Sequence, residues 1–107
     1  MSLIKTITEY FAGMPRRSSR WPALRAAHLK DNPRCICCGS KTNLEVHHIL
    51  PFHLYPDQEL AGGNLVTLCE AGGNCHFLIG HLKDWKSYNL DVRKDAEVLR
   101  KKIQAKP

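Results

Sequence analysis

The chain has 107 residues, of which 43% are hydrophobic and 24% are charged, and its formal net charge is +6. This length fits one small domain, and the sequence has no internal repeat, no low-complexity segment and no apolar run long enough to span a bilayer. We expect a cytosolic protein with reduced thiols, because its five cysteines are an odd number and its first residues lack the apolar run of a signal peptide.

The first predicted element lies within residues 1–17, where apolar residues recur at helical spacing. This segment forms either a short amphipathic helix or a tail that docks on a partner. A second helix is predicted from an N-cap at Ser18 or Ser19 to about Lys30, with Pro22 tolerated in its first turn.

The second helix is expected to turn Trp21, Leu24 and His28 toward the core, with Arg20 and Arg25 on other faces. Asn32-Pro33 ends it, because a residue before proline avoids the helical region.

Two short strands are predicted next, around Leu44 to Val46 and over Leu65 to Leu68. The long loop between them is expected to be functional, since long loops are uncommon in small domains. A helix opens after Cys75 and runs to about Leu82. The last helix is capped by Asp91, and one of its faces carries Val92, Ala96, Leu99 and Ile103.

The charge is concentrated at the two ends of the chain. Residues 1–34 have seven Lys/Arg against two Asp/Glu, residues 35–82 have one against four, and residues 83–107 have eight against four. Basic flanks favour binding to a polyanion, although ordinary solvated helix faces would give the same pattern. The candidates for phosphate contacts are Arg16, Arg17, Arg20, Arg25, Arg34, Lys83 and Lys86.

Four cysteines have the spacing of a zinc site. Cys35 and Cys38 form a C-x-x-C pair, followed by Gly39, which can adopt the positive φ of a tight turn. Cys69 and Cys75 supply the second pair. Zinc with four thiolates has no open position, so this ion would be structural and catalysis would need a second metal. Cys37 is left as a spare thiol.

Several motifs occur in a fixed order: the C-x-x-C pair, Glu45-Val46-His47-His48-Ile49, Asn64-Leu65 before a cysteine, Cys75-His76, and Gly80-His81-Leu82. Over residues 19–90 this order resembles the HNH endonuclease family, in particular its phage-type members. The resemblance implies an α+β fold with a small ββα-metal (His-Me finger) core stapled by a structural zinc, with flanking N- and C-terminal helices. Residues 18–107 would form the nuclease domain, with its core at 35–84.

The resemblance also implies the roles of single residues. His48 matches the general base, Asn64 the middle motif residue, and His76 a metal ligand on the helix. His47 stands where many members carry an aspartate ligand, so the metal preference shifts from Mg²⁺ toward zinc, nickel or manganese. His81, five residues after His76, is a further candidate ligand or phosphate contact.

Neighbouring strand residues face opposite sides, so His47 and His48 can reach one site only if the strand ends or bulges there. We expect such an irregularity. Alternatively, His47 packs elsewhere and the ion has fewer protein ligands. Trp21, Trp85 and Tyr88 are expected to pack in the core rather than stack on bases.

These features predict a metal-dependent DNA endonuclease with a histidine base and one catalytic divalent cation, Mg²⁺, Mn²⁺, Ni²⁺ or Zn²⁺. The expected partner is double-stranded DNA. The phage-type resemblance adds phage packaging proteins and a bacterial host cytoplasm. The alternative is a catalytically silent, zinc-stapled DNA-binding or adaptor module, and a weaker one is a nuclease directed at RNA.

Overall fold

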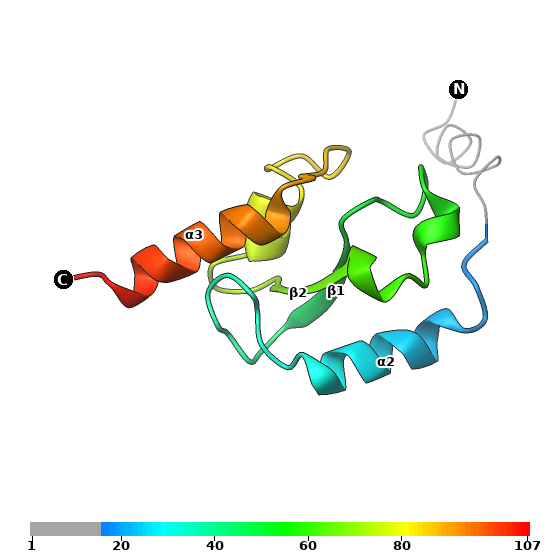
Figure 1. The fold of residues 1–107 in the computed structure, drawn as a ribbon, viewed down its shortest axis with the longest axis horizontal. Coiled ribbons are helices and arrows are strands. Elements are labelled where there is room, and N and C mark those ends of the chain that lie inside the picture. Colours follow the sequence, from blue (N-terminus) through cyan, green and yellow to red (C-terminus); the bar gives the residue numbers. More distant parts are fainter. Residues whose placement is uncertain (1–15) are drawn as a thin grey trace, which may run out of the picture.

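The computed structural model describes residues 16–107, so most of the helix or tail predicted over residues 1–17 lies outside the described residues. The elements are helix α2 (Trp21–Asp31), strand β1 (Leu44–His48), strand β2 (Leu65–Cys69), a π-helical turn at His76–Gly80 and helix α3 (Val92–Gln104) (Figure 1). The predicted α+β order is confirmed for this part of the chain. Neither of these two helices is long and apolar enough to cross a membrane.

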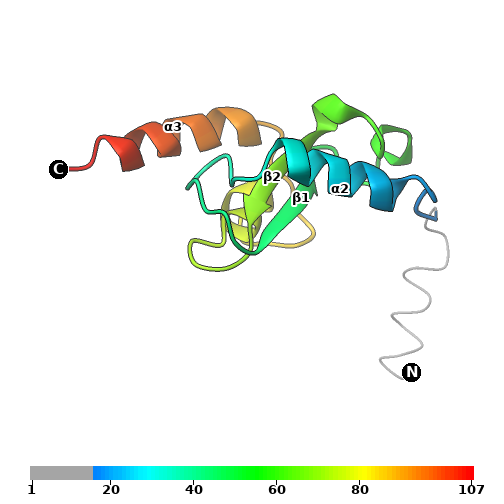
Figure 2. The ribbon, with the colours of Figure 1, turned by 90° about the horizontal axis from the view of Figure 1, so that it is seen from below.

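Strands β1 and β2 form an antiparallel hairpin in which Leu44 pairs with Cys69 and His48 pairs with Leu65. Helix α2 and the π turn both contact the two strands, and they lie on opposite sides of the hairpin (Figures 1 and 2). Because β2 is covered in this way, all five of its residues are buried. The hairpin and the π turn together make the ββα unit that the resemblance implies.

The hydrophobic core is small and rich in sulfur. Four of its eight buried residues are cysteines, and the other four are Val66, Leu68, Val92 and Ala96. A core of this size leaves little margin for a domain of about 90 ordered residues. A cross-link among the cysteines would therefore contribute directly to folding.

The helix ends differ in detail from the prediction. The N-cap of α2 is Arg20 rather than a serine, while the Ser18 hydroxyl accepts a hydrogen bond from the Arg20 N–H at 3.1 Å. Asp91 does precede α3, but its side chain makes no capping bond among residues 16–107. The Asp91 N–H instead donates to Asn89 Oδ1 at 3.0 Å.

Helix α3 is packed only at its start. Val92 and Ala96 are buried, whereas Leu99 on the same predicted face is 39% exposed. The second half of α3 extends away from the body of the molecule (Figure 1). The predicted apolar face therefore packs against the core over little more than its first turn.

Candidate metal centres

The four predicted cysteines come together in one cluster. The sulfurs of Cys35, Cys38, Cys69 and Cys75 all lie within 4.8 Å of one another, and those of Cys38 and Cys69 are 3.6 Å apart. A tetrahedral site with zinc–sulfur bonds of about 2.3 Å places its sulfurs roughly 3.8 Å apart. The cluster therefore has the dimensions of a four-thiolate zinc site.

The backbone around Cys35 shapes this cluster. Gly39 has φ +79°, which lets its N–H donate to the Cys35 carbonyl at 3.0 Å and close the turn. Burial alone would raise the pKa of Cys35, but nearby backbone N–H groups outweigh it and lower that pKa. Preorganised N–H groups of this kind stabilise a thiolate, which is the form that binds metal.

The surroundings of Cys75 disfavour its thiolate form. Burial, followed by the charge of neighbouring thiols such as Cys35, raises the pKa of Cys75. A divalent cation at the centre would reverse this effect and hold the thiolates. Cys37 is fully buried and lies outside the cluster.

A second cluster contains three histidines. Ring nitrogens of His47, His76 and His81 lie within 4.8 Å of one another, and His76 Nε2 is 3.2 Å from His81 Nε2. His47 comes from β1, His76 opens the π turn, and His81 follows it. The cluster thus joins residues from both parts of the ββα unit.

The π turn explains how His76 and His81 meet although they are five residues apart. The His81 N–H donates to the His76 carbonyl at 3.1 Å, which is the i to i+5 hydrogen bond of a π helix. Gly80 lets this turn lie close against the hairpin. A Cβ on it would lie 3.1 Å from His47 Cε1 and 3.1 Å from Leu68 Cδ1.

Outer partners orient two of the three rings. His76 Nδ1 lies 3.0 Å from Glu70 Oε1, and His81 Nδ1 lies 2.8 Å from the Ser87 carbonyl oxygen. Carboxylate and carbonyl oxygens only accept, so in the neutral form of each ring Nδ1 carries the proton and Nε2 has a free lone pair. These lone pairs are the ones that face each other across the cluster.

His47 completes a site suited to a cation. Burial, followed by the neighbouring His76 and His81, lowers the pKa of His47 to about 3, so its ring is neutral near pH 7. Its Nε2 is buried and has no hydrogen-bond partner among residues 16–107. An unpartnered buried nitrogen is costly. Three imidazoles, one of them with an orphaned nitrogen, fit a divalent transition metal with an open position.

His48 is the last residue of β1, and the pairing is regular up to it. The strand therefore ends at this point and does not bulge, which is one of the two irregularities expected. The rings of His47 and His48 reach different partners, yet both line one cleft of about 890 Å³. His48 packs against Trp21 with ring centroids 4.6 Å apart.

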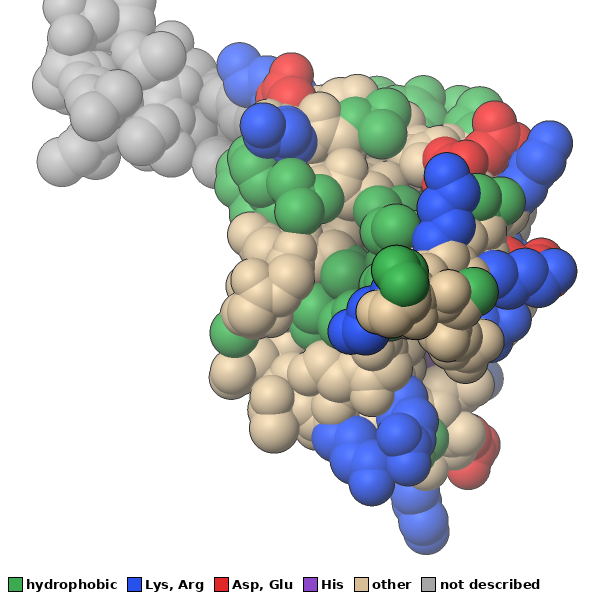
Figure 3. Space-filling model, turned by 90° about the vertical axis from the view of Figure 1, so that its left-hand side faces the viewer, with side chains coloured by type: hydrophobic (Ala, Val, Ile, Leu, Met, Phe, Trp, Pro, Cys, Tyr) green, Lys and Arg blue, Asp and Glu red, His purple; other side chains and the backbone are tan. Residues whose placement is uncertain are grey.

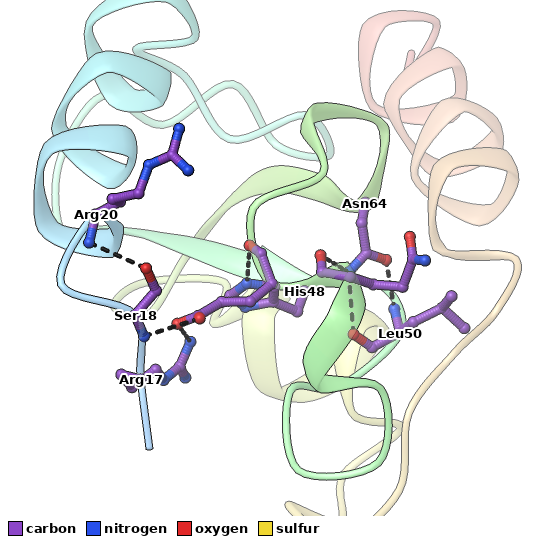
Figure 4. Close-up of polar contacts among 8 residues, drawn as sticks. Arg17, Ser18, Arg20, His48, Leu50 and Asn64 are labelled. Atoms are coloured by element: carbon purple, nitrogen blue, oxygen red, sulfur yellow. Dashed lines mark hydrogen bonds and ion pairs between the residues drawn. The ribbon is translucent and has the colours of Figure 1, made fainter. Parts of the chain in front are cut away.

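The His48 ring has a defined tautomer. Its Nε2 lies 2.9 Å from the Glu59 carbonyl oxygen, which can only accept (Figure 4). Nδ1 is therefore the unprotonated nitrogen of the neutral ring. Burial lowers the pKa of His48 and the positive charge of Arg17 adds to this, although the Glu59 carbonyl opposes both. His48 is thus a neutral proton acceptor on the cleft.

Asn64 lies outside the residues that line the cleft. Its Oδ1 accepts from the Leu50 N–H at 2.7 Å, and its Nδ2 donates to the carbonyls of Leu50 and Gln58 at 3.0 and 3.2 Å (Figure 4). Asn64 therefore fixes the loop that follows His48 and leads to Glu59. Asn64 stabilises the conformation of this loop, and none of its hydrogen bonds is to the histidine cluster.

The predicted basic residues divide into two groups. Arg17, Arg25 and Lys86 line the cleft, whereas Arg16, Arg20 and Lys83 do not. Arg25, which was expected off the apolar stripe of α2, lines the cleft, and its Nη2 pairs with Glu45 Oε2 on β1 at 2.9 Å.

Arg17 is held by contacts on three sides. Its guanidinium carbon lies 4.4 Å from the Phe52 ring centroid and 5.3 Å from that of Trp21. Its Nη1 is 3.5 Å from Glu59 Oε2. Its place at the edge of the cleft is therefore well defined.

Sequence patterns did not single out Glu59 or Glu70. Glu70 directly follows Cys69 as His76 follows Cys75, and this parallel was the available signal. Trp85 was expected in the core, and that was wrong, because it is 56% exposed and lines the cleft.

Comparison with known proteins gives one result. A protein-family model described as HNH endonuclease matches residues 35–81. No curated protein and no solved structure gave a significant match. The matched segment contains every residue of both clusters, together with His48 and Asn64.

Proposed function

We propose that the chain is a metal-dependent DNA endonuclease that hydrolyses phosphodiester bonds by a one-metal mechanism, in keeping with the HNH endonuclease model that matches residues 35–81. The observation that carries this proposal is the three-histidine cluster in the same cleft as a neutral His48. A site for a divalent cation and a proton acceptor beside it are the two groups that such hydrolysis requires.

In this proposal His47, His76 and His81 hold the catalytic cation through their unprotonated ring nitrogens. When bound, the ion would neutralise charge on the phosphate and on the departing 3′ oxygen. Imidazole ligands favour zinc, nickel or manganese over Mg²⁺. The four-cysteine cluster takes the structural zinc, which has no open position.

His48 acts as the general base in this proposal. Its Nδ1 takes the proton from the attacking water, and the Glu59 carbonyl stabilises the ring as it becomes positive. Packing against Trp21 keeps the ring in place. Asn64 is assigned a positioning role, because its three hydrogen bonds hold the loop that carries the Glu59 carbonyl.

We assign DNA binding to the basic residues around the cleft and at the ends of the chain. Arg17 and Lys86 lie on the cleft itself, and Arg25 shares its charge with Glu45. Arg16, Arg20 and Lys83 would add contacts outside the cleft. On the face at which α3 ends, Lys and Arg side chains outnumber acidic ones (Figure 3). An excess of positive charge of this kind attracts the phosphates of double-stranded DNA.

The finer biological setting rests on the phage-type resemblance alone. It extends the proposal to a role beside DNA packaging proteins in the cytoplasm of a bacterial host. Residues 18–107 would act as the nuclease domain, and residues 1–17 as a helix or docking tail.

The test is cleavage of supercoiled plasmid by purified protein with Mg²⁺, Mn²⁺, Ni²⁺ or Zn²⁺ added singly. We expect nicking with at least one of the transition metals and none by His48→Ala under the same conditions. No nicking with any ion, or equal nicking by His48→Ala, would remove the enzyme proposal.

One observation favours a second function, a catalytically silent DNA-binding or adaptor module. His47 stands where many family members carry a carboxylate ligand. Counting bound metals separates the two, because an adaptor needs only the zinc at the cysteines. The nuclease needs a further, exchangeable ion at the histidines.

A further inference from the structure

Trp85 is the feature of the cleft that the proposed chemistry does not use. It lies between the π turn and α3 and is 56% exposed, which is unusual for the largest apolar side chain. It lines the same cleft as the three histidines. An indole left open to solvent beside a candidate active site is available to a ligand that could cover it.

The loop that carries Trp85 is closed by its own hydrogen bonds. His81 Nδ1 donates to the Ser87 carbonyl at 2.8 Å, the Ser87 N–H donates to the Asp84 carbonyl at 2.8 Å, and the Asp84 N–H donates to the His81 carbonyl at 3.1 Å. The Lys86 N–H also donates to Asp84 Oδ1 at 3.0 Å. Trp85 therefore lies on an ordered turn. Binding of a ligand would cost little conformational entropy in this loop, because the loop is already ordered.

The indole of Trp85 lies against the rings of the histidine cluster. Its centroid lies 5.3 Å from that of His76, 4.9 Å from that of His81 and 4.9 Å from that of Phe77. These contacts cover part of the side chain and leave 56% of it exposed. A group stacked on Trp85 would lie close to the histidine cluster, because the indole itself contacts His76 and His81, and Lys86 lines the same cleft and could meet a phosphate.

We propose that Trp85 stacks on an unpaired base next to the phosphate held at the histidine cluster, so that single-stranded or locally unpaired DNA is the preferred substrate. Inside a duplex both faces of a base are covered by its neighbours, so a base must leave the stack before a side chain can cover it. The location of that phosphate rests on the proposed function, whereas stacking itself requires only Trp85 and DNA.

A binding experiment without cleavage tests the stacking step. The chain has two tryptophans, so Trp21→Phe with His48→Ala leaves Trp85 as the single fluorophore in an inactive protein. Three probes of equal length are titrated: a thymidine oligonucleotide, the same strand without bases, and a fully paired duplex. We expect the thymidine strand to quench Trp85 and to bind about tenfold more tightly than the abasic strand. Equal quenching and equal affinity for these two strands would overturn the proposal.

Substitutions test whether Trp85 carries the preference. Trp85→Leu is expected to lose most of the preference for the thymidine strand over the duplex, whereas Trp85→Phe keeps much of it. Leu90→Ala is the matched control, because Leu90 is 62% exposed and lies outside the cleft. Binding of Mn²⁺ to each variant shows whether the histidine cluster is intact. A preference unchanged in Trp85→Leu would contradict the proposal.

Failure of this inference differs from failure of the nuclease proposal. A protein that never nicks plasmid but binds unpaired DNA through Trp85 would refute the nuclease and leave the stacking site. A protein that cleaves paired and unpaired DNA equally, with or without Trp85, would refute the stacking site and leave the nuclease.

Discussion

The cysteine cluster and the histidine cluster differ in the number of their ligands and in their exposure. Four sulfurs meet in the core, three of them on buried residues, whereas three imidazoles meet at the wall of a cleft. The first arrangement leaves a bound ion no open position, and the second leaves at least one. The buried cluster is therefore suited to a structural ion, and the open cluster is the one suited to chemistry.

The two clusters are joined through the chain at two points. Cys69 is followed by Glu70, and Cys75 by His76, while Glu70 and His76 are themselves hydrogen-bonded at 3.0 Å. Holding two cysteines on one ion therefore also places a histidine and the carboxylate that orients it. An ion at the cysteine cluster would therefore also position part of the histidine cluster.

Removing one thiolate should have the largest effect. Cys75→Ser is expected to unfold residues 18–107, because zinc binding by four thiolates contributes about 10–16 kcal/mol and a small domain has a stability of about 5–15 kcal/mol. Far-UV circular dichroism and the bound zinc content measure this. An equally heat-resistant fold in Cys75→Ser would contradict the structural role.

Cys37→Ala provides the control for that comparison. Cys37 is fully buried but outside the cluster, so its loss should cost only about 1 kcal/mol through packing. Zinc content should stay unchanged in this variant.

Removing the proposed base should affect chemistry without affecting the fold. His48→Ala is expected to lower the cleavage rate by about 10²–10⁴-fold, because proton transfer is lost. Zinc content and the affinity for Mn²⁺ should stay near wild type, since His48 lies outside the three-histidine cluster. Single-turnover cleavage and metal titration measure the two effects, and a parallel loss of metal would assign His48 to the cation site instead.

Glu70→Gln should weaken the open cluster alone. The carboxylate orients the His76 ring, and changes at such outer partners typically reduce metal affinity by about 10–100-fold. Isothermal titration with Mn²⁺ measures the loss, and the zinc at the cysteines should remain. Asp57→Asn removes a charge from another exposed acid and should change nothing. Equal affinities in the two variants would show that Glu70 does not support the site.

Gly80→Ala should give the smallest effect. Its Cβ would lie 3.1 Å from His47 Cε1, so the π turn or the His47 ring must shift, at a cost of about 1–3 kcal/mol. The midpoint temperature of thermal unfolding and the affinity for Mn²⁺ should both decrease. Gly62→Ala is the control, because nothing lies within 4 Å of a Cβ there. Equal behaviour of the two variants would mean that the close approach of the turn is unimportant.

Much of the fold could be predicted because its signals are local. Proline positions placed α2 and short β-prone runs placed the two strands, while the spacing within each cysteine pair indicated the four-cysteine cluster. Packing of α3 was less predictable. Its apolar pattern continues to Ile103, but whether such a face is covered depends on distant parts of the chain.

In the candidate site, too, locally encoded features could be predicted and features that depend on the tertiary structure could not. The ordered His and Cys motifs indicated the residues that meet, but not how His76 and His81 come to share one face, because a π turn has no clear sequence signature. Nor could the sequence show that the Glu59 carbonyl meets His48, since any residue supplies a carbonyl. Trp85 was misplaced because a tryptophan is usually buried, and exposure at a cleft depends on the tertiary structure.

The central claim is that two different ions occupy the two clusters, and metal counting by native mass spectrometry tests it most directly. We predict that dialysed wild-type protein retains one zinc and gains a second ion when Mn²⁺ or Ni²⁺ is added. His47→Ala should retain the zinc and fail to gain the second ion. Binding of only one ion by the wild type, or of the second ion equally by His47→Ala, would contradict the account.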